Sequence, residues 1–197
     1  MSKYYILDYE VVNNDYYAER GELSNLEVQS LMYDGVSLKD KNFSIILKKL
    51  TVKGRKLDVR NMIGNLYGLP IVSQLIADIL SWHCPNDIEL FEVKVNMPAK
   101  EKYYFVNVLN TLADCIDIEK SVFEFILPER PDIILFNYLE KMVLKTEKIN
   151  HHIFRLKPIS TKIIVSEWLK DKIQELGMAE IVFEPTEAYQ TGMYMKK

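Results

Sequence analysis

Short apolar runs and stretches of alternating apolar and polar residues recur along the chain, and both patterns are typical of strands. The alternation is clearest at residues 88–95, where apolar side chains take turns with charged ones. Strands are predicted at residues 4–8, 43–52, 88–95, 103–109, 122–127, 153–156, 162–165 and 180–184. Residues 132–148 fit neither period and are open to a helix or a long strand. Residues 13–40 and 61–69 are predicted to be mainly loop.

Two segments have the spacing of amphipathic helices, and each begins at a serine that can cap it. The first runs over residues 73–83 and ends before Pro85. Its apolar stripe consists of Leu75, Ile76, Ile79 and Leu80. The second begins at Ser166 and ends at Gly177, which accepts left-handed backbone at no steric cost. Its predicted apolar face consists of Trp168, Leu169, Ile173 and Leu176.

The two helices belong to a pattern of strand, serine cap, helix and strand that occurs twice, about 93 residues apart. Residues 71–73 (IVS) match residues 164–166 (IVS), and, after a slip of one residue, 91–92 (FE) match 183–184 (FE). Chance similarity between two capped helices is the alternative explanation. The pattern predicts an α+β fold with mixed or antiparallel sheets. We expect two α+β halves, residues 1–100 and 101–197, or one continuous domain.

Composition is that of a globular protein, with 48% hydrophobic and 27% charged residues in a chain of 197. No apolar run approaches the roughly 18 residues of a membrane span, and the first residues lack the pattern of a signal peptide. We therefore expect a cytoplasmic protein. Its two cysteines, Cys84 and Cys115, are expected to be reduced and to serve as small buried apolar side chains.

The net charge of −3 is unevenly distributed. Residues 1–40 contain eight acids against three bases, whereas residues 41–60 contain seven bases against one acid. The basic run at 48–56 has no interleaved aromatic residue for base stacking, and the pI near 5.7 is low for a nucleic-acid-binding domain. Both observations argue against nucleic-acid binding. A strand edge blunted by lysine is the simpler explanation of the run.

Catalytic and ligand-binding motifs are weak. The three histidines, His83, His151 and His152, lack the spacing of zinc ligands, and no phosphate-binding glycine loop or nucleophile motif is present. His151 and His152 are expected in a polar turn before a strand. Acidic pairs such as Asp114 and Asp117 are more typical of turns than of acid–base catalysis. The sequence therefore predicts no catalytic, cofactor-binding or metal site.

Three segments carry a family resemblance: residues 103–110 (YYFVNVLN), residues 112–117 (LADCID), and the run at 153–185 that contains IFR, IIVSE and FEP. Together they resemble the bacterial polymorphic-toxin immunity proteins of immunity family eleven, formerly a domain of unknown function. The resemblance lies mostly in residues 71–185. It implies a cytosolic binding protein that neutralises a cognate toxin by stoichiometric inhibition.

Partner contacts are expected in the variable acidic segment, which combines aromatic anchors with negative charge. The candidates are Asp15, Tyr16, Tyr17, Glu19, Glu22 and Asp34. A nuclease toxin would be basic and would suit such a surface. Two alternatives stay open: an adaptor or structural protein associated with toxin delivery, and an enzyme of unrecognised type.

Overall fold

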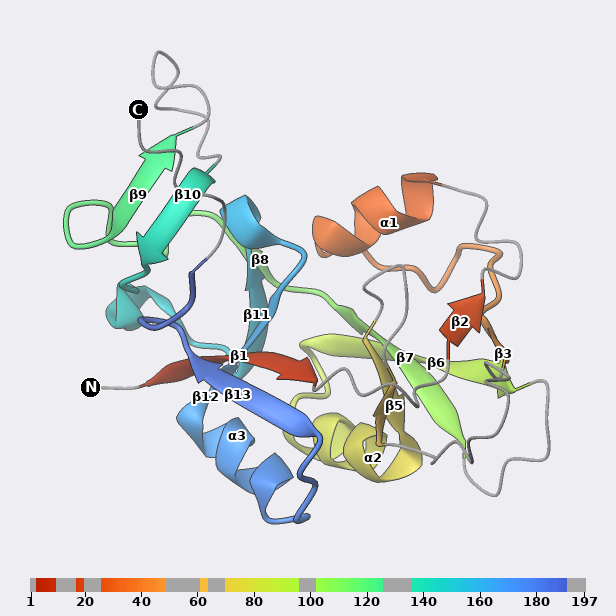
Figure 1. The fold of residues 1–197 in the computed structure, drawn as a ribbon. Helices are drawn as coiled ribbons and strands as arrows, with labels where there is room; N and C mark the ends of the chain where they lie inside the picture. The colour runs from red at the N-terminus through yellow and green to blue at the C-terminus, as the bar shows by residue number, and fades with distance from the viewer. Residues whose placement is uncertain are drawn as a thin grey trace, which may run out of the picture.

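The computed structural model describes residues 3–9, 17–19, 26–48, 61–63, 70–95, 102–125 and 136–190. Their strands form two mixed sheets and one hairpin, and helices α2 and α3 lie side by side at the bottom of the view in Figure 1. The predicted α+β class, with mixed sheets and two strand–helix–strand units, is confirmed.

One sheet has the strand order β13-β1-β12-β11-β8. The bounds of its strands are β1 Tyr4–Tyr9, β8 Thr111–Leu112, β11 Ile153–Leu156, β12 Ile163–Ser166 and β13 Ile181–Pro185. Neighbouring strands are antiparallel except for β11 and β8, which are parallel.

The other sheet has the order β2-β3-β6-β7-β5-β4. Its strands are β2 Tyr17–Glu19, β3 Ile46–Lys48, β4 Met62–Ile63, β5 Ile71–Ser73, β6 Ile88–Val95 and β7 Tyr103–Val108. Here only β3 and β6 are parallel. The hairpin consists of β9 (Val122–Phe125) and β10 (Phe136–Lys141).

The helical elements are α1 Leu26–Tyr33, α2 Gln74–His83, α3 Glu167–Gln174, and the 3-10 turns η1 Thr146–Lys148 and η2 Lys157–Ile159. Helix α1 lies in a segment for which loop was expected, so that expectation is wrong there. Val28 and Met32, which lie one turn apart, are buried, but polar residues flank the helix in the sequence. The helical pattern of apolar residues was therefore too short to stand out. For residues 132–148, the strand alternative is confirmed by β10. Other predicted segments are only partly described: residues 49–52 of the strand 43–52, 64–69 of the loop 61–69 and 126–127 of the strand 122–127 lie outside the described residues.

The two serines at the helix starts behave differently. Ser166 caps α3 as predicted, because its Oγ accepts the Leu169 N–H at 3.2 Å. Ser73 occupies the same position before α2, but its hydroxyl donates to Asn61 Oδ1 at 2.9 Å and makes no side-chain cap. Gly177 follows α3 with φ +68°, which confirms its role at the helix end.

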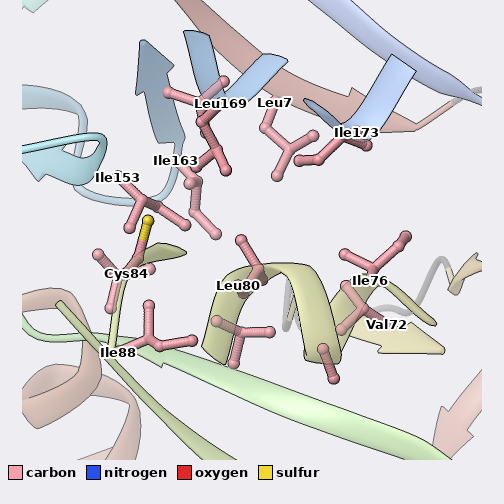
Figure 2. Packing of buried hydrophobic residues seen from close by; sticks show 14 of the residues in the cluster. Leu7, Val72, Ile76, Leu80, Cys84, Ile88, Ile153, Ile163, Leu169 and Ile173 are labelled. Carbon is pink, nitrogen blue, oxygen red and sulfur yellow. The ribbon is translucent and has the colours of Figure 1, made fainter. Parts of the chain in front are cut away.

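The main core lies between the two strand–helix units. Figure 2 shows Ile76 and Leu80 of α2 pointing toward Leu169 and Ile173 of α3. Cys84 lies in this cluster, and burial raises the pKa of its thiol to about 12. Both cysteines are free and buried, as predicted. Two further clusters pack the outer faces of the sheets.

Strand pairing crosses the expected boundary at residue 100. β1, from the first half of the sequence, lies between β12 and β13. β7, from the second half, lies between β5 and β6. The division into halves therefore stays a prediction. If the halves exist, each contributes one strand to the sheet of the other.

A buried carboxylate fixes the loop after α1 to the sheet. Glu89 accepts hydrogen bonds from the Ser37 hydroxyl at 2.5 Å, the Leu38 N–H at 2.9 Å and the Asn107 amide at 3.1 Å. Burial alone would raise the pKa of Glu89, but these hydrogen bonds outweigh it and hold the pKa below its usual value.

Glu89→Gln is expected to lower the free energy of unfolding by about 1–3 kcal/mol at pH 7, because a glutamine NH2 would face existing donors. The folded-state pKa of Glu89 is depressed. Its contribution is therefore present above the unfolded-state pKa and is lost as pH falls through the folded-state pKa. Urea denaturation between about pH 3 and about pH 7, a range that includes the ordinary pKa of a glutamate, should show a shallower acid slope in the variant. An unchanged slope would contradict the assignment.

Arg155 in β11 has no exposed surface. Its Nη1 donates to the Ser160 carbonyl at 2.6 Å, and its guanidinium lies 5.6 Å from the centre of the Tyr33 ring. Its Nε and Nη2 make no hydrogen bond, and no carboxylate among the described residues pairs with it. Burial lowers the pKa of Arg155 to about 10, so the folded state carries the charge at a cost.

Arg155→Met should keep or raise the free energy of unfolding, by up to about 3 kcal/mol, because it removes a buried charge without an ionic partner. A base with a depressed folded-state pKa destabilises the fold at every pH below that pKa, so the gain should be present throughout the neutral range. Urea denaturation at pH 7 measures it. Arg155→Lys, which keeps the charge, is the control and should be destabilised. A loss of more than about 1 kcal/mol in the Met variant would contradict the argument.

Candidate functional site

A cleft of about 350 Å³ opens where β12 passes into α3. Three parts of the chain contribute to it: the start of β1, the approach to β11, and the β12–α3 junction. The lining residues are Lys3, Tyr4, Ile149, Asn150, His151, His152, Ser166, Glu167 and Trp168. The cleft therefore combines apolar walls with several polar groups, as binding sites commonly do.

Trp168 is the centre of an aromatic cluster beside the cleft. Its ring centroid lies 4.5 Å from that of His152 and 4.7 Å from that of His83, with the His83 ring nearly perpendicular. These distances are those of aromatic pairs that stabilise one another. The cluster brings together α2, α3 and the approach to β11.

The prediction that Trp168 lies on the buried face of its helix is wrong, because the residue is 41% exposed. Leu169 and Ile173, four residues apart, occupy the core-facing side of α3. Trp168 precedes Leu169 by one position and is therefore turned by about 100° toward solvent.

Trp82 is a second exposed tryptophan, and it lies in α2. It is 81% exposed, the highest value among the exposed large hydrophobic side chains of the described residues. It directly precedes His83, which touches Trp168. We call Trp82, His83, His152 and Trp168 the aromatic surface. Trp82 is out of phase with the buried positions of α2, so its indole is a separate exposed group next to the His83–Trp168 contact and not a ring within it. Exposed large apolar side chains are common at protein interaction sites.

The two adjacent histidines make separate polar contacts. His152 Nδ1 lies 2.8 Å from Ser166 Oγ, and His151 Nδ1 lies 3.0 Å from Asp87 Oδ1. Asp87 Oδ1 also accepts the Asn110 amide at 2.8 Å. Both histidines lie directly before β11, as predicted from sequence, and these contacts hold their imidazoles at the rim of the cleft.

The contacts do not form a hydrolytic relay. In a Ser–His–Asp arrangement one histidine bridges the serine and the carboxylate. Here Ser166 contacts His152, whereas Asp87 contacts His151. Ser166 Oγ is also engaged as the cap of α3. The arrangement is better suited to binding than to nucleophilic chemistry.

Within the part of the chain that the structure describes, no group of three or more His, Cys, Asp or Glu side chains is placed to hold a metal ion. No helix in the described ranges is long and apolar enough to cross a membrane.

The predicted acidic contact residues are only partly placed. Tyr17 and Glu19 lie in β2, which pairs with β3, and Asp34 is exposed in the turn after α1. Asp15, Tyr16 and Glu22 lie outside the described residues. Their common role as a contact surface stays a prediction.

Sequence reasoning considered His83, His152 and Trp168 in other roles and missed Trp82, so it did not predict the aromatic surface. A usable signal was present: the buried positions of α2 are Ile76, Ala77 and Leu80, and Trp82 is out of phase with them. A tryptophan on the polar side of an amphipathic helix indicates a contact that the fold itself does not satisfy.

Comparison with known families identifies the chain. The family model for the immunity protein family Imm11 matches residues 17–188. The chain belongs to this family of immunity proteins. The match spans both expected halves and includes every residue of the aromatic surface. Within the cleft, only Lys3 and Tyr4 of β1 precede the matched range. No curated protein matches the chain.

Proposed function

We propose that this Imm11 protein binds a cognate protein toxin in the cytoplasm and neutralises it by forming a stoichiometric complex. The observation that carries the proposal is the family match over residues 17–188. A site that exposes two tryptophans but lacks a hydrolytic relay supports binding as the mode of action.

The aromatic surface is the proposed centre of the contact with the toxin. Tryptophans are prominent among residues that dominate binding free energy, because they bury a large rigid area with little loss of entropy. Trp82 and Trp168 come from different helices, and His83, the residue after Trp82, contacts the Trp168 ring. The neighbouring cleft would accept a side chain of the toxin.

The acidic segment is proposed as a second, peripheral part of the contact. Its candidates are Asp15, Tyr16, Tyr17, Glu19, Glu22 and Asp34. Negative charge at this position would attract a basic toxin, such as a nuclease, and would mainly speed association.

Co-expression with the toxin encoded beside this protein tests the function. We expect survival of the cells together with a stable complex of fixed stoichiometry after purification. Survival without a complex would reject stoichiometric inhibition and favour an enzyme that modifies the toxin, in which case the His151–Asp87 pair becomes the first candidate. A complex without protection would favour an adaptor.

Reversing the charge of Glu19 and Glu22 to lysine should weaken toxin binding and reduce its dependence on salt concentration, because long-range attraction is lost. Association rates measured at two salt concentrations by surface plasmon resonance report the effect. Glu124 and Glu140 on the β9–β10 hairpin, both exposed, provide a control with the same change in net charge. Equal losses in the two double variants would show that only net charge matters.

A further inference from the structure

Each sheet contains the same arrangement of four strands and one helix. In the first, the order is β6-β7-β5-β4, and α2 connects β5 to β6. In the second, the order is β13-β1-β12-β11, and α3 connects β12 to β13. All three neighbouring pairs in each set are antiparallel. The two sets therefore agree in order, direction and helix position.

Strand register extends the agreement to single residues. Ser73 pairs with Tyr103 in the first set, and Ser166 pairs with Tyr4 in the second. The strands after the helices correspond at the same offset of 93 positions, since Ile88 and Ile181 occupy equivalent places. Aligning the two sets by strand register therefore needs no shift after the helices, unlike the match of residues 91–92 with 183–184 in the sequence. The central strands also share their sequence, KYY, at residues 3–5 and 102–104.

Backbone hydrogen bonds at the strand–helix junctions repeat in the same way. The Gln74 N–H donates to the Lys102 carbonyl at 3.0 Å, and the Glu167 N–H donates to the Lys3 carbonyl at 2.9 Å. The Ser73 N–H bonds to Asn61 at 2.7 Å, as the Ser166 N–H bonds to His152 at 2.9 Å.

Side chains at these junctions repeat as well. The Tyr104 hydroxyl donates to Gln74 Oε1 at 2.7 Å, and the Tyr5 hydroxyl donates to Glu167 Oε1 at 3.2 Å. Gln74 and Glu167 are again 93 positions apart. Chance similarity between two capped helices would not reproduce the central strand, its register and its tyrosine contacts together.

The central strands have changed places. β1 opens the first half of the sequence but lies in the sheet of the second, between β12 and β13. β7 opens the second half but lies in the sheet of the first, between β5 and β6. The first strand of each half therefore lies in the sheet of the other half.

Contacts between the halves are reciprocal. Asp87 lies just before β6, and His151 lies just before β11. Asp87 Oδ1 and His151 Nδ1 are 3.0 Å apart. Glu180, which lies just before β13, is the equivalent of Asp87, and Asn61 lies just before β4. The Glu180 carboxylate accepts hydrogen bonds from the Asn61 backbone N–H at 3.1 Å and from its side-chain amide at 3.0 Å. Reciprocity of this kind is the property of a two-fold symmetric dimer interface.

We infer that residues 3–95 and 102–190 are two copies of one module, fused in a single chain, that have exchanged their first strands. The fold is thus a covalently joined, strand-exchanged dimer. The cleft at Trp168 is a product of the exchange, because Lys3 and Tyr4 come from the first copy and its other walls from the second. The inference is independent of the proposed function.

Cutting the chain between the copies tests it. A site for a sequence-specific protease is placed within residues 96–101, and the folded full-length protein is cleaved. We expect the two fragments to elute together at the size of the uncut variant, which is the control. After separation in denaturant, each fragment alone should lack a cooperative thermal transition, because its sheet has lost its central strand. Mixing the fragments should restore the transition.

Two outcomes would overturn the inference: separation of the fragments under native conditions, or cooperative folding of one fragment alone. If the inserted site prevents folding, paired cysteines give an independent measurement. Glu92→Cys should form a disulfide with Tyr104→Cys, its partner in the exchanged register. It should form none with Tyr5→Cys, the equivalent residue of the other copy. A disulfide between residues 5 and 92 would show that the strands are not exchanged.

Discussion

Trp82→Ala should weaken the complex with the cognate toxin by about 2–4 kcal/mol, which corresponds to a roughly thirty- to thousand-fold rise in Kd. The expected loss is large because an indole that is 81% exposed in the free protein can be buried almost entirely by a partner. Folding should be little affected, since this side chain contributes almost nothing to the core. Isothermal titration calorimetry measures the affinity, and thermal denaturation of the free variant checks the fold.

Val122→Ala is the matched control for this substitution. Val122 is an exposed apolar residue in β9, and that strand contributes to neither the cleft nor the aromatic surface. Its replacement should change affinity by less than about 0.5 kcal/mol. If Trp82→Ala behaves like the control, the toxin does not bind the aromatic surface, and the acidic segment becomes the leading candidate.

Leu80→Ala should lower the free energy of unfolding by about 2–5 kcal/mol. The side chain is 1% exposed and points from α2 into the core that joins the two modules, toward Leu169 (Figure 2). Truncation would leave a cavity between closely packed helices, which cannot collapse fully because both are fixed to sheets. Urea denaturation followed by circular dichroism measures the loss.

Leu75→Ala provides the comparison, because it makes the same chemical change on the same helix. Leu75 is 49% exposed, so its truncation should cost less than about 1 kcal/mol. Similar losses at the two positions would mean that α2 does not bury the face assigned to it. A loss of unfolding free energy at Leu80 but not at Leu75 would show that the buried face of α2 stabilises the fold through the core between the modules.

Local patterns in the sequence located most of the regular structure. Alternation identified β6, and clusters of β-branched and aromatic residues identified β1, β7 and β12. Helices α2 and α3 were found because each has an apolar stripe of helical period after a serine. These features depend on residues within a few positions of one another, so a single sequence contains them.

Features that depend on distant residues were not predicted. The pairing of β1 with β12 and β13 is set by contacts across almost the whole chain, and no local pattern indicates it. The repeat was detected, but its central strands were not recognised as part of it. The cause is physical: the copies differ in length between the KYY strand and the next equivalent strand, so the central strand has its own offset.

The candidate site was harder still to predict. Its chemistry depends on Trp168 and His152 meeting across two elements, and on His83 reaching them from α2. Sequence reasoning assigned Trp168 to packing and concentrated on the acidic segment before residue 43. Most of that segment's candidate residues have no described side chain, so its role stays a prediction.

The position of β1 has a consequence for synthesis of the protein. β1 leaves the ribosome long before β12 and β13, the two strands that flank it in the sheet. Closing so long a loop slows folding, and β1 offers two unpaired edges until its partners emerge. We therefore expect refolding to be slow for a chain of this length. During translation, the YYILDY segment should be a principal binding site for chaperones.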